Sequence, residues 1–81
     1  MSKNITATRK AFGSKNFAQV TLTVPDKVEE AFKEYNVQIV DYPDGKTTMF
    51  LCGSGYDVDS ISFRPVGDNF SWAVKELYER L

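Results

Sequence analysis

Apolar and polar side chains alternate along two stretches near the start of the chain, which predicts two β-strands. The stretches are "ITATRKAF" and "NFAQVTLTV", and the "GSKN" where they meet has the composition of a hairpin loop. Because side chains alternate between the faces of a strand, pairing Phe12 with Phe17 gathers the apolar residues on one face. These residues are Ile5, Ala7, Ala11, Ala18, Val20, Leu22 and Val24. The other face is polar, with the two phenylalanines at its tip.

A helical pattern follows this hairpin. Pro25 ends the second strand, and Asp26 suits the N-cap of a helix over residues 27–35. The apolar positions recur at helical spacing and are expected to face the core. They are Val28, Ala31, Phe32 and Tyr35.

A second hairpin is predicted by "VQIVDY", "PDG" and "KTTMFLC", because proline and glycine favour the angles of a tight turn. If Tyr42 pairs with Lys46, Ile39 meets Met49 and Val37 meets Leu51 on the core face. The opposite face also carries apolar groups, namely Val40, Tyr42, Phe50 and Cys52. This second face is therefore either partly covered or an exposed patch on an open side of the sheet, through which a second copy of the chain could pack.

The last elements predicted are a strand over Ser60 to Arg64, with Ile61 and Phe63 pointing inward, and a helix over residues 69–81 capped by Asp68 or Asn69. The helix has one apolar stripe. It consists of Phe70, Ala73, Val74, Leu77, Tyr78 and Leu81.

These elements predict an α+β two-layer sandwich. Its antiparallel sheet has about five strands, the element order is ββαβββα, and two helices pack on one face. The 81 residues fit a single compact domain over 1–81, with residues 1–3 expected to be flexible. The expected core joins both helices to the sheet. It comprises Leu22, Phe32, Ile39, Met49, Leu51, Phe63, Val74 and Leu77.

Composition excludes several classes of protein. With 42% hydrophobic and 26% charged residues the chain resembles an ordinary globular protein, and no apolar run is long enough to span a bilayer. We expect no membrane association and a cytoplasmic location. Cys52 is the only cysteine, so no intrachain disulfide can form, and the absence of histidine excludes Ser/His/Asp triads and zinc sites that need imidazole.

The stretch "LCGSGYDVD" is the one candidate for cofactor chemistry. A phosphate-binding loop needs backbone N–H groups and a following helix, whereas a strand is expected here and Asp57 and Asp59 would repel phosphate. Ser54, Asp57, Asp59 and Ser60 offer oxygen ligands but lack the spacing of a calcium loop. We therefore predict a simple turn, no metal, no cofactor and no enzymatic activity.

Charge is unevenly distributed along the chain, which suggests a nucleic-acid interface as one function. Four basic residues precede the first acidic one, Asp26, and lysines beside aromatic rings can hold single-stranded nucleic acid. The candidate residues of this alternative are Arg9, Lys10, Phe12, Lys15 and Phe17. The simpler interpretation is that the lysines keep a sheet edge from aggregating.

The preferred hypothesis is a small binding module that acts through a protein partner, as an adaptor or inhibitor. Trp72 lies off the apolar stripe of the last helix, where it is either an exposed anchor or folded back on Pro65 and Val66. An acidic side could meet a basic partner, including a protein that handles nucleic acid. The candidate residues are Trp72, Tyr42, Phe50, Asp41, Asp44, Asp57 and Asp59.

Overall fold

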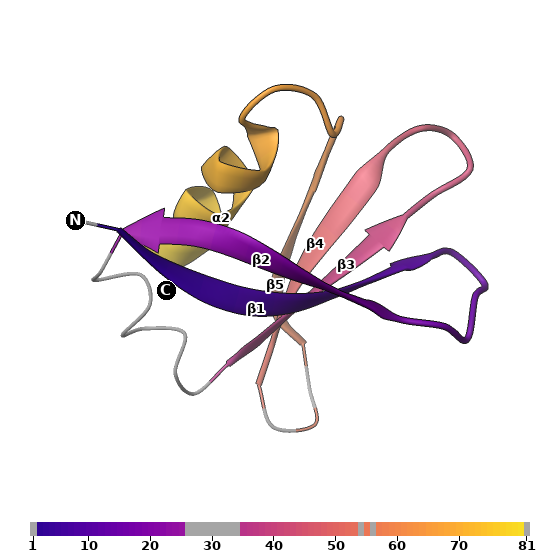
Figure 1. Ribbon diagram of the computed structural model, residues 1–81, viewed down its shortest axis with the longest axis horizontal. Helices are drawn as coiled ribbons and strands as arrows, with labels where there is room; N and C mark the ends of the chain where they lie inside the picture. The colour runs from indigo at the N-terminus through magenta and orange to yellow at the C-terminus, as the bar shows by residue number, and fades with distance from the viewer. Residues whose placement is uncertain (1, 26–34, 54, 56, 81) are drawn as a thin grey trace.

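Five β-strands and one helix make up the part of the chain that the computed structural model describes, residues 2–25, 35–53, 55 and 57–80. The strands form one sheet in the order β2-β1-β3-β4-β5, and the helix α2 lies across one face of it (Figure 1). The elements are β1 (Ser2–Ala11), β2 (Ala18–Pro25), β3 (Asn36–Asp41), β4 (Thr47–Cys52), β5 (Asp57–Phe63) and α2 (Asn69–Glu79).

The sheet is mixed, so the prediction of an antiparallel sheet is wrong. β1 and β3 run parallel, with Thr8 beside Gln38 and Ala11 beside Asp41, while the other neighbouring strands are antiparallel. We call these four paired positions the parallel seam. The hairpin patterns fix the direction only of strands joined by a short loop, whereas β2 and β3 are separated by a longer segment that allows a crossover. β3 therefore adds to β1, and β2 becomes an edge.

The prediction of two helices on the sheet is also corrected, because the described residues contain one helix. The predicted helix over residues 27–35 lies outside the described residues except for Tyr35, which precedes β3 without helical structure. The fold is α+β at most, and most of its regular structure is strand.

The β1–β2 hairpin has the predicted faces but a shifted register. Pairing Phe12 with Phe17 would place Arg9 opposite Val20, but Arg9 pairs with Ala18, two positions away. The loop is therefore longer than predicted and includes both Phe12 and Phe17. A shift by an even number of residues leaves every side chain on its face, so the apolar face is as predicted. Gly13 takes the positive φ of 83° that the turn requires.

The β3–β4 hairpin is confirmed residue by residue. Ile39 pairs with Met49 and Val37 with Leu51, and the Tyr42 N–H donates to the carbonyl of Lys46 over 2.9 Å. Gly45 closes the turn with a φ of 88°.

The core lies between the sheet and α2. Six of the eight predicted members are buried there, Leu22 packs at its margin, and Phe32 lies outside the described residues. The buried set is Ala7, Val24, Val37, Ile39, Met49, Leu51, Ile61, Phe63, Ala73, Val74 and Leu77. The helix stripe is confirmed for its described members, since Ala73, Val74 and Leu77 are buried while Phe70 and Tyr78 pack against them.

β5 begins earlier than predicted and carries an irregularity. Its first residue is Asp57 rather than Ser60, and the register against β4 shifts between Leu51 and Cys52. Such a bulge places side chains that lie two residues apart across it on opposite faces of the sheet, where a regular strand would place them on the same face. Asp57 therefore pairs with Cys52, on the face away from α2, whereas Asp59 pairs with the core residue Leu51.

Candidate functional site

Three aromatic rings and a lysine gather at one end of the sheet. Because β1 and β3 are parallel, the segments that follow them leave at the same end, which brings Phe12 beside Tyr42. Their rings stack with centroids 5.1 Å apart at an interplanar angle of 30°. The Lys10 ammonium lies 4.9 Å from the ring centroid of Phe17. We call Phe12, Phe17, Tyr42 and Lys10 the aromatic tip.

The aromatic tip is exposed, yet its loop is held in place. Phe12 is 62% and Phe17 55% accessible, and two exposed rings on one loop form an apolar patch of the kind that marks an interaction surface. The Phe12 N–H donates to the carbonyl of Asp41 over 2.7 Å, and the Ser14 N–H donates to the carbonyl of Ala11 over 2.9 Å. A partner would thus meet rings whose supporting backbone is already ordered.

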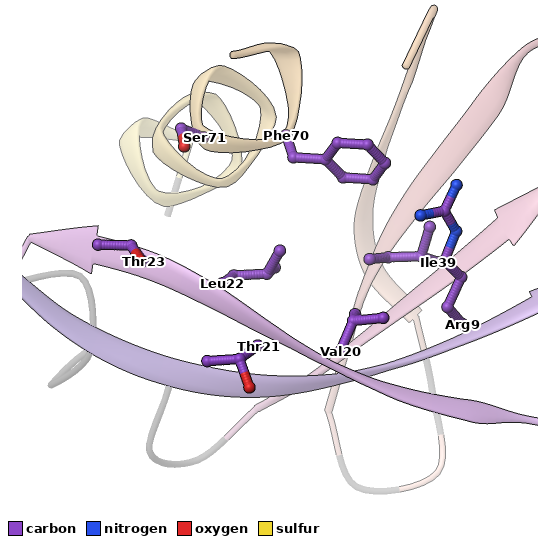
Figure 2. Close-up of a pocket in the computed structure, with 8 residues that line it drawn as sticks. All are labelled: Arg9, Val20, Thr21, Leu22, Thr23, Ile39, Phe70 and Ser71. Carbon is purple, nitrogen blue, oxygen red and sulfur yellow. The ribbon is translucent and has the colours of Figure 1, made fainter. Parts of the chain in front are cut away.

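A groove of about 340 Å³ lies between β2 and the first turn of α2 (Figure 2). Phe70 extends from the helix above the sheet, where Arg9 and Ile39 close one end of the groove (Figure 2). Val20 and Leu22 supply its apolar floor along the edge strand. Sequence reasoning placed both on the apolar face but did not predict the groove.

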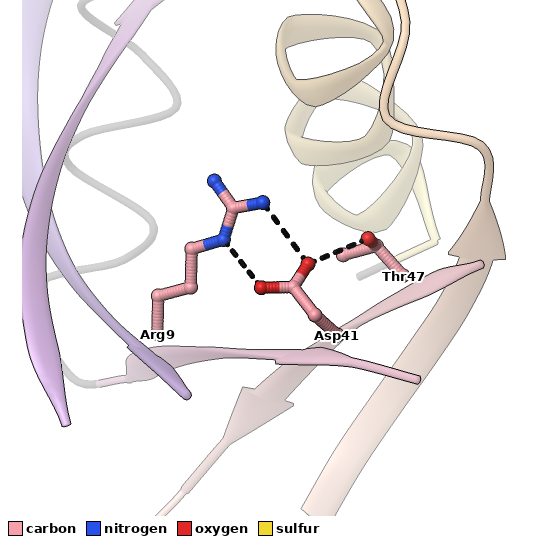
Figure 3. A network of polar contacts seen from close by, with 3 residues as sticks. All are labelled: Arg9, Asp41 and Thr47. Atoms are coloured by element: carbon pink, nitrogen blue, oxygen red, sulfur yellow. Dashed lines mark hydrogen bonds and ion pairs between the residues drawn. The ribbon is translucent and has the colours of Figure 1, made fainter. Parts of the chain in front are cut away.

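Arg9 and Asp41 form an ion pair on the helix side of the sheet (Figure 3). Arg9 donates from Nε to Asp41 Oδ2 over 2.7 Å and from Nη2 to Oδ1 over 3.0 Å. The Thr47 hydroxyl donates to Oδ1 over 2.8 Å, and the guanidinium carbon lies 5.1 Å from the ring centroid of Phe70. The hydrogen bond to Asp41 raises the pKa of Arg9, and the same bond lowers the pKa of Asp41.

This ion pair joins residues that the sequence assigned to two different surfaces. Arg9 was a nucleic-acid candidate and Asp41 a candidate for an acidic partner surface, yet each neutralises the other. Arg9 is therefore separated from Lys10, whose side chain lies on the opposite face at the aromatic tip. Lys15 is exposed in the same loop as Phe12 and Phe17.

The four candidate aspartates do not form one acidic side. Asp44 lies in the β3–β4 turn, where it accepts the Lys46 N–H over 2.9 Å. Asp57 begins β5 at the opposite end of that hairpin and accepts the Cys52 thiol over 3.3 Å. Asp59 lies 3.6 Å from Arg80 on the helix side. With Asp41 held by Arg9, the structure brings no two of these carboxylates together.

The face of the sheet away from α2 is partly covered. Val40 and Thr48 are buried there, while Tyr42, Phe50 and Cys52 are half-buried. Burial, with a smaller contribution from Asp57, raises the pKa of the Cys52 thiol to about 11. The thiol is therefore protonated at neutral pH and is a poor nucleophile.

The glycine-rich stretch joins two strands. β4 ends at Cys52 and β5 starts at Asp57, so no helix follows the glycines that could direct its positive end at a phosphate. Nowhere in residues 2–25, 35–53, 55 and 57–80 do three carboxylate or thiol side chains gather closely enough to hold a metal ion.

Trp72 lies near the start of α2 and is 49% exposed. Val66 is 63% exposed, too open to be covered by an indole folded back on it. Of the two alternatives, the structure therefore places Trp72 on the surface. Its role in partner binding stays a prediction.

Fluorescence of Trp72, the chain's only tryptophan, tests this placement. We expect red-shifted emission that acrylamide quenches readily, because half of the residue is accessible. Trp72→Ala should change the free energy of unfolding by less than about 1 kcal/mol, as is usual for a surface position. Denatured protein gives the limit of full exposure. Blue-shifted emission that resists quenching, together with strong destabilisation by the substitution, would contradict the surface position.

Within the described ranges, no helix combines the length and the apolar character needed to cross a membrane. No family model, no curated protein and no solved structure matches the chain, so its function has to be argued from its own surfaces.

Proposed function

We propose that the chain is a small non-enzymatic binding module that acts through a protein partner, as an adaptor or inhibitor, with the aromatic tip as its contact surface. One observation carries the proposal, namely the exposure of Phe12 and Phe17, 62% and 55%, on a loop fixed by backbone hydrogen bonds. Aromatic side chains that bury a large area at little cost in entropy are typical of the residues that dominate protein interfaces.

Charge favours a protein over nucleic acid as the partner. A surface that follows a nucleic-acid backbone needs several unpaired cations along one groove. Arg9 is paired with Asp41, which leaves Lys10, Lys15 and Lys46 near the aromatic tip, Lys46 in the turn beside Tyr42. Asp44 lies in the turn that follows Tyr42 at the same end of the sheet. The mixed charges around exposed rings suit the polar rim of a protein interface.

Nucleic acid remains the second candidate because of one contact. Lys10 lies over the ring of Phe17, so a cation and an exposed aromatic face stand together as single-strand binding requires. Capture experiments that include nuclease separate the two candidates.

The non-enzymatic role is supported by the chemistry of the side chains. The chain has no histidine, and the raised pKa of Cys52 keeps its thiol protonated. Asp41 and Asp59 are engaged in ion pairs with Arg9 and Arg80. The lowered pKa of Asp41 makes its carboxylate a weak general base.

Capture from lysate of the native host tests the proposal. The parent chain should retain a specific protein after nuclease treatment, and a Phe12→Ala/Phe17→Ala double variant should lose at least about tenfold in affinity, or about 1.4 kcal/mol. Val66→Ala is the matched control, because Val66 is another exposed apolar residue and follows β5, the edge strand on the other side of the sheet from the β1–β2 loop.

Two results would contradict the proposal. Equal capture by the double variant and the parent would exclude the aromatic tip as the contact surface. Capture that disappears on nuclease treatment, with direct binding of an oligonucleotide by the parent, would favour the second candidate.

A further inference from the structure

The two edges of the sheet differ in how well they are protected from pairing with another strand. An edge strand presents unpaired backbone N–H and C=O groups, and proteins protect such edges with charged residues, bulges or covering side chains. β5 has all three devices. It carries Asp57 and Asp59, its register against β4 is interrupted, and Arg80 donates to the carbonyl of Ser60 over 3.2 Å.

Within the described ranges, β2, at the other edge, shows none of these devices over most of its length. Its sequence AQVTLTVP contains no charged residue, and proline occurs only at its last position. Its pairing with β1 runs without a bulge from Arg9 and Ala18 to Ser2 and Pro25. Among the described residues, no strand pairs with its outer side. The edge is therefore long, regular and uncharged.

The side chains of β2 leave an apolar surface beside this edge. Val20 and Leu22 are only half-buried, although both lie on the core face, and they form the floor of the groove under Phe70 (Figure 2). On the other face Gln19, Thr21 and Thr23 are exposed. An added strand would cover Val20 and Leu22 on the core face. On the other face it would lie beside the polar side chains of Gln19, Thr21 and Thr23.

We propose that a second copy of this chain pairs with β2 in antiparallel orientation, which joins two sheets into one across a twofold axis at Thr21. Thr21 is the midpoint of Ala18–Val24, the uninterrupted uncharged stretch. In this register Val20 lies opposite Leu22 of the partner subunit on the helix side. On the open face Thr21 meets Thr21 of the partner subunit, and such threonine pairs are favourable in antiparallel sheets.

Charge and pattern select a second copy as the occupant. Self-pairing of a charged strand sets like charges close together, whereas β2 has no charge to oppose. An interface between identical surfaces must also be complementary to itself about the twofold axis. The alternation centred on Thr21 meets this requirement, because apolar side chains lie opposite apolar ones and polar side chains opposite polar ones. The surface is distinct from the aromatic tip, so the dimer goes beyond the proposed function.

The test is the mass of the purified protein in solution across concentration. Pairing through one strand buries a small area, so we expect a weak dimer whose mass rises from 9.2 kDa toward twice that value between about 1 µM and about 1 mM in sedimentation equilibrium. Thr21→Lys should remain a monomer over the whole range, because it sets two ammonium groups together at the axis.

Thr6→Lys is the matched control. Thr6 pairs with Thr21 inside the same hairpin and is exposed on the same face, but it lies on the interior strand β1. This variant should dimerise like the parent. Gln19→Lys, another exposed position of β2, repeats the test if Thr21→Lys fails to fold, which circular dichroism would show.

Three outcomes would overturn the proposal. A parent protein that stays monomeric at every concentration would exclude the second copy and leave the edge to a strand of a different protein. A Thr21→Lys variant that dimerises like the parent would exclude β2. Loss of the dimer in both Thr21→Lys and Thr6→Lys would point to the open face of the sheet instead of its edge.

Discussion

Leu77→Ala should lower the free energy of unfolding by about 2 to 5 kcal/mol, a large share of the stability of a domain this small. Leu77 is 0% exposed and lies with Ala73 and Val74 in the stripe that α2 presents to the sheet. Truncation removes its buried methyl groups and leaves a cavity that the sheet on the other side cannot fill. Chemical denaturation followed by circular dichroism measures the change.

Lys75→Ala is the control for this substitution. Lys75 lies on the same helix but is exposed, so its truncation keeps helix propensity and leaves the core intact. We expect a change within about 0.5 kcal/mol for the control. If Leu77→Ala unfolded at the same denaturant concentration as Lys75→Ala, α2 would not be packed on the sheet as described.

Asp41→Asn should lower the free energy of unfolding by about 1 to 2 kcal/mol at neutral pH. The amide keeps the size of the carboxylate but cannot accept both hydrogen bonds from Arg9 and that from Thr47, which is 1% exposed. The side chains of Arg9 and Asp41 are 36% and 34% exposed, so solvent screens much of their charge attraction and the loss stays below that of a buried pair.

The pH dependence of this loss follows from the lowered pKa of Asp41. A carboxylate with a lower pKa in the folded than in the unfolded state stabilises the protein above its unfolded pKa, about 4, and this stabilisation is lost as pH falls through the folded pKa. The difference in the free energy of unfolding between the parent and Asp41→Asn should therefore be constant between about pH 5 and pH 8. It should become smaller below about pH 4.

Asp68→Asn is the control, because it makes the same change in charge at an exposed residue with no side-chain capping hydrogen bond. A difference between the parent and Asp41→Asn that stayed constant down to about pH 2 would show that the ion pair does not contribute through the charge of Asp41. Denaturation curves for the three proteins at several pH values supply the measurement.

Local patterns predicted the parts of this fold that local forces determine. The β3–β4 register follows from one proline-glycine turn and the alternation on either side, and the stripe of α2 follows from helical spacing. In the first hairpin the faces were predicted but not the register, because alternation is unchanged by a shift of two residues whereas the loop length sets the pairing.

The relation between the two hairpins could not be predicted in the same way. No local pattern states that β3 lies beside β1 or runs parallel to it, since that choice depends on how the whole apolar surface is covered. The candidate site shows the same limit. Phe12 and Phe17 were recognised at the tip, but the stacking of Tyr42 on Phe12 and the pairing of Arg9 with Asp41 both require the parallel seam.

The parallel seam also bears on how the chain assembles. Residues that pair within the β1–β2 hairpin or within the β3–β4 and β4–β5 hairpins are close in sequence, so their strands can meet after the closure of short loops. Thr8 and Gln38 are far apart, and bringing them together costs more chain entropy before any contact across the seam is gained. The seam is therefore the costly step in closing the sheet, where a two-stranded and a three-stranded unit, each locally connected, become one cooperative structure.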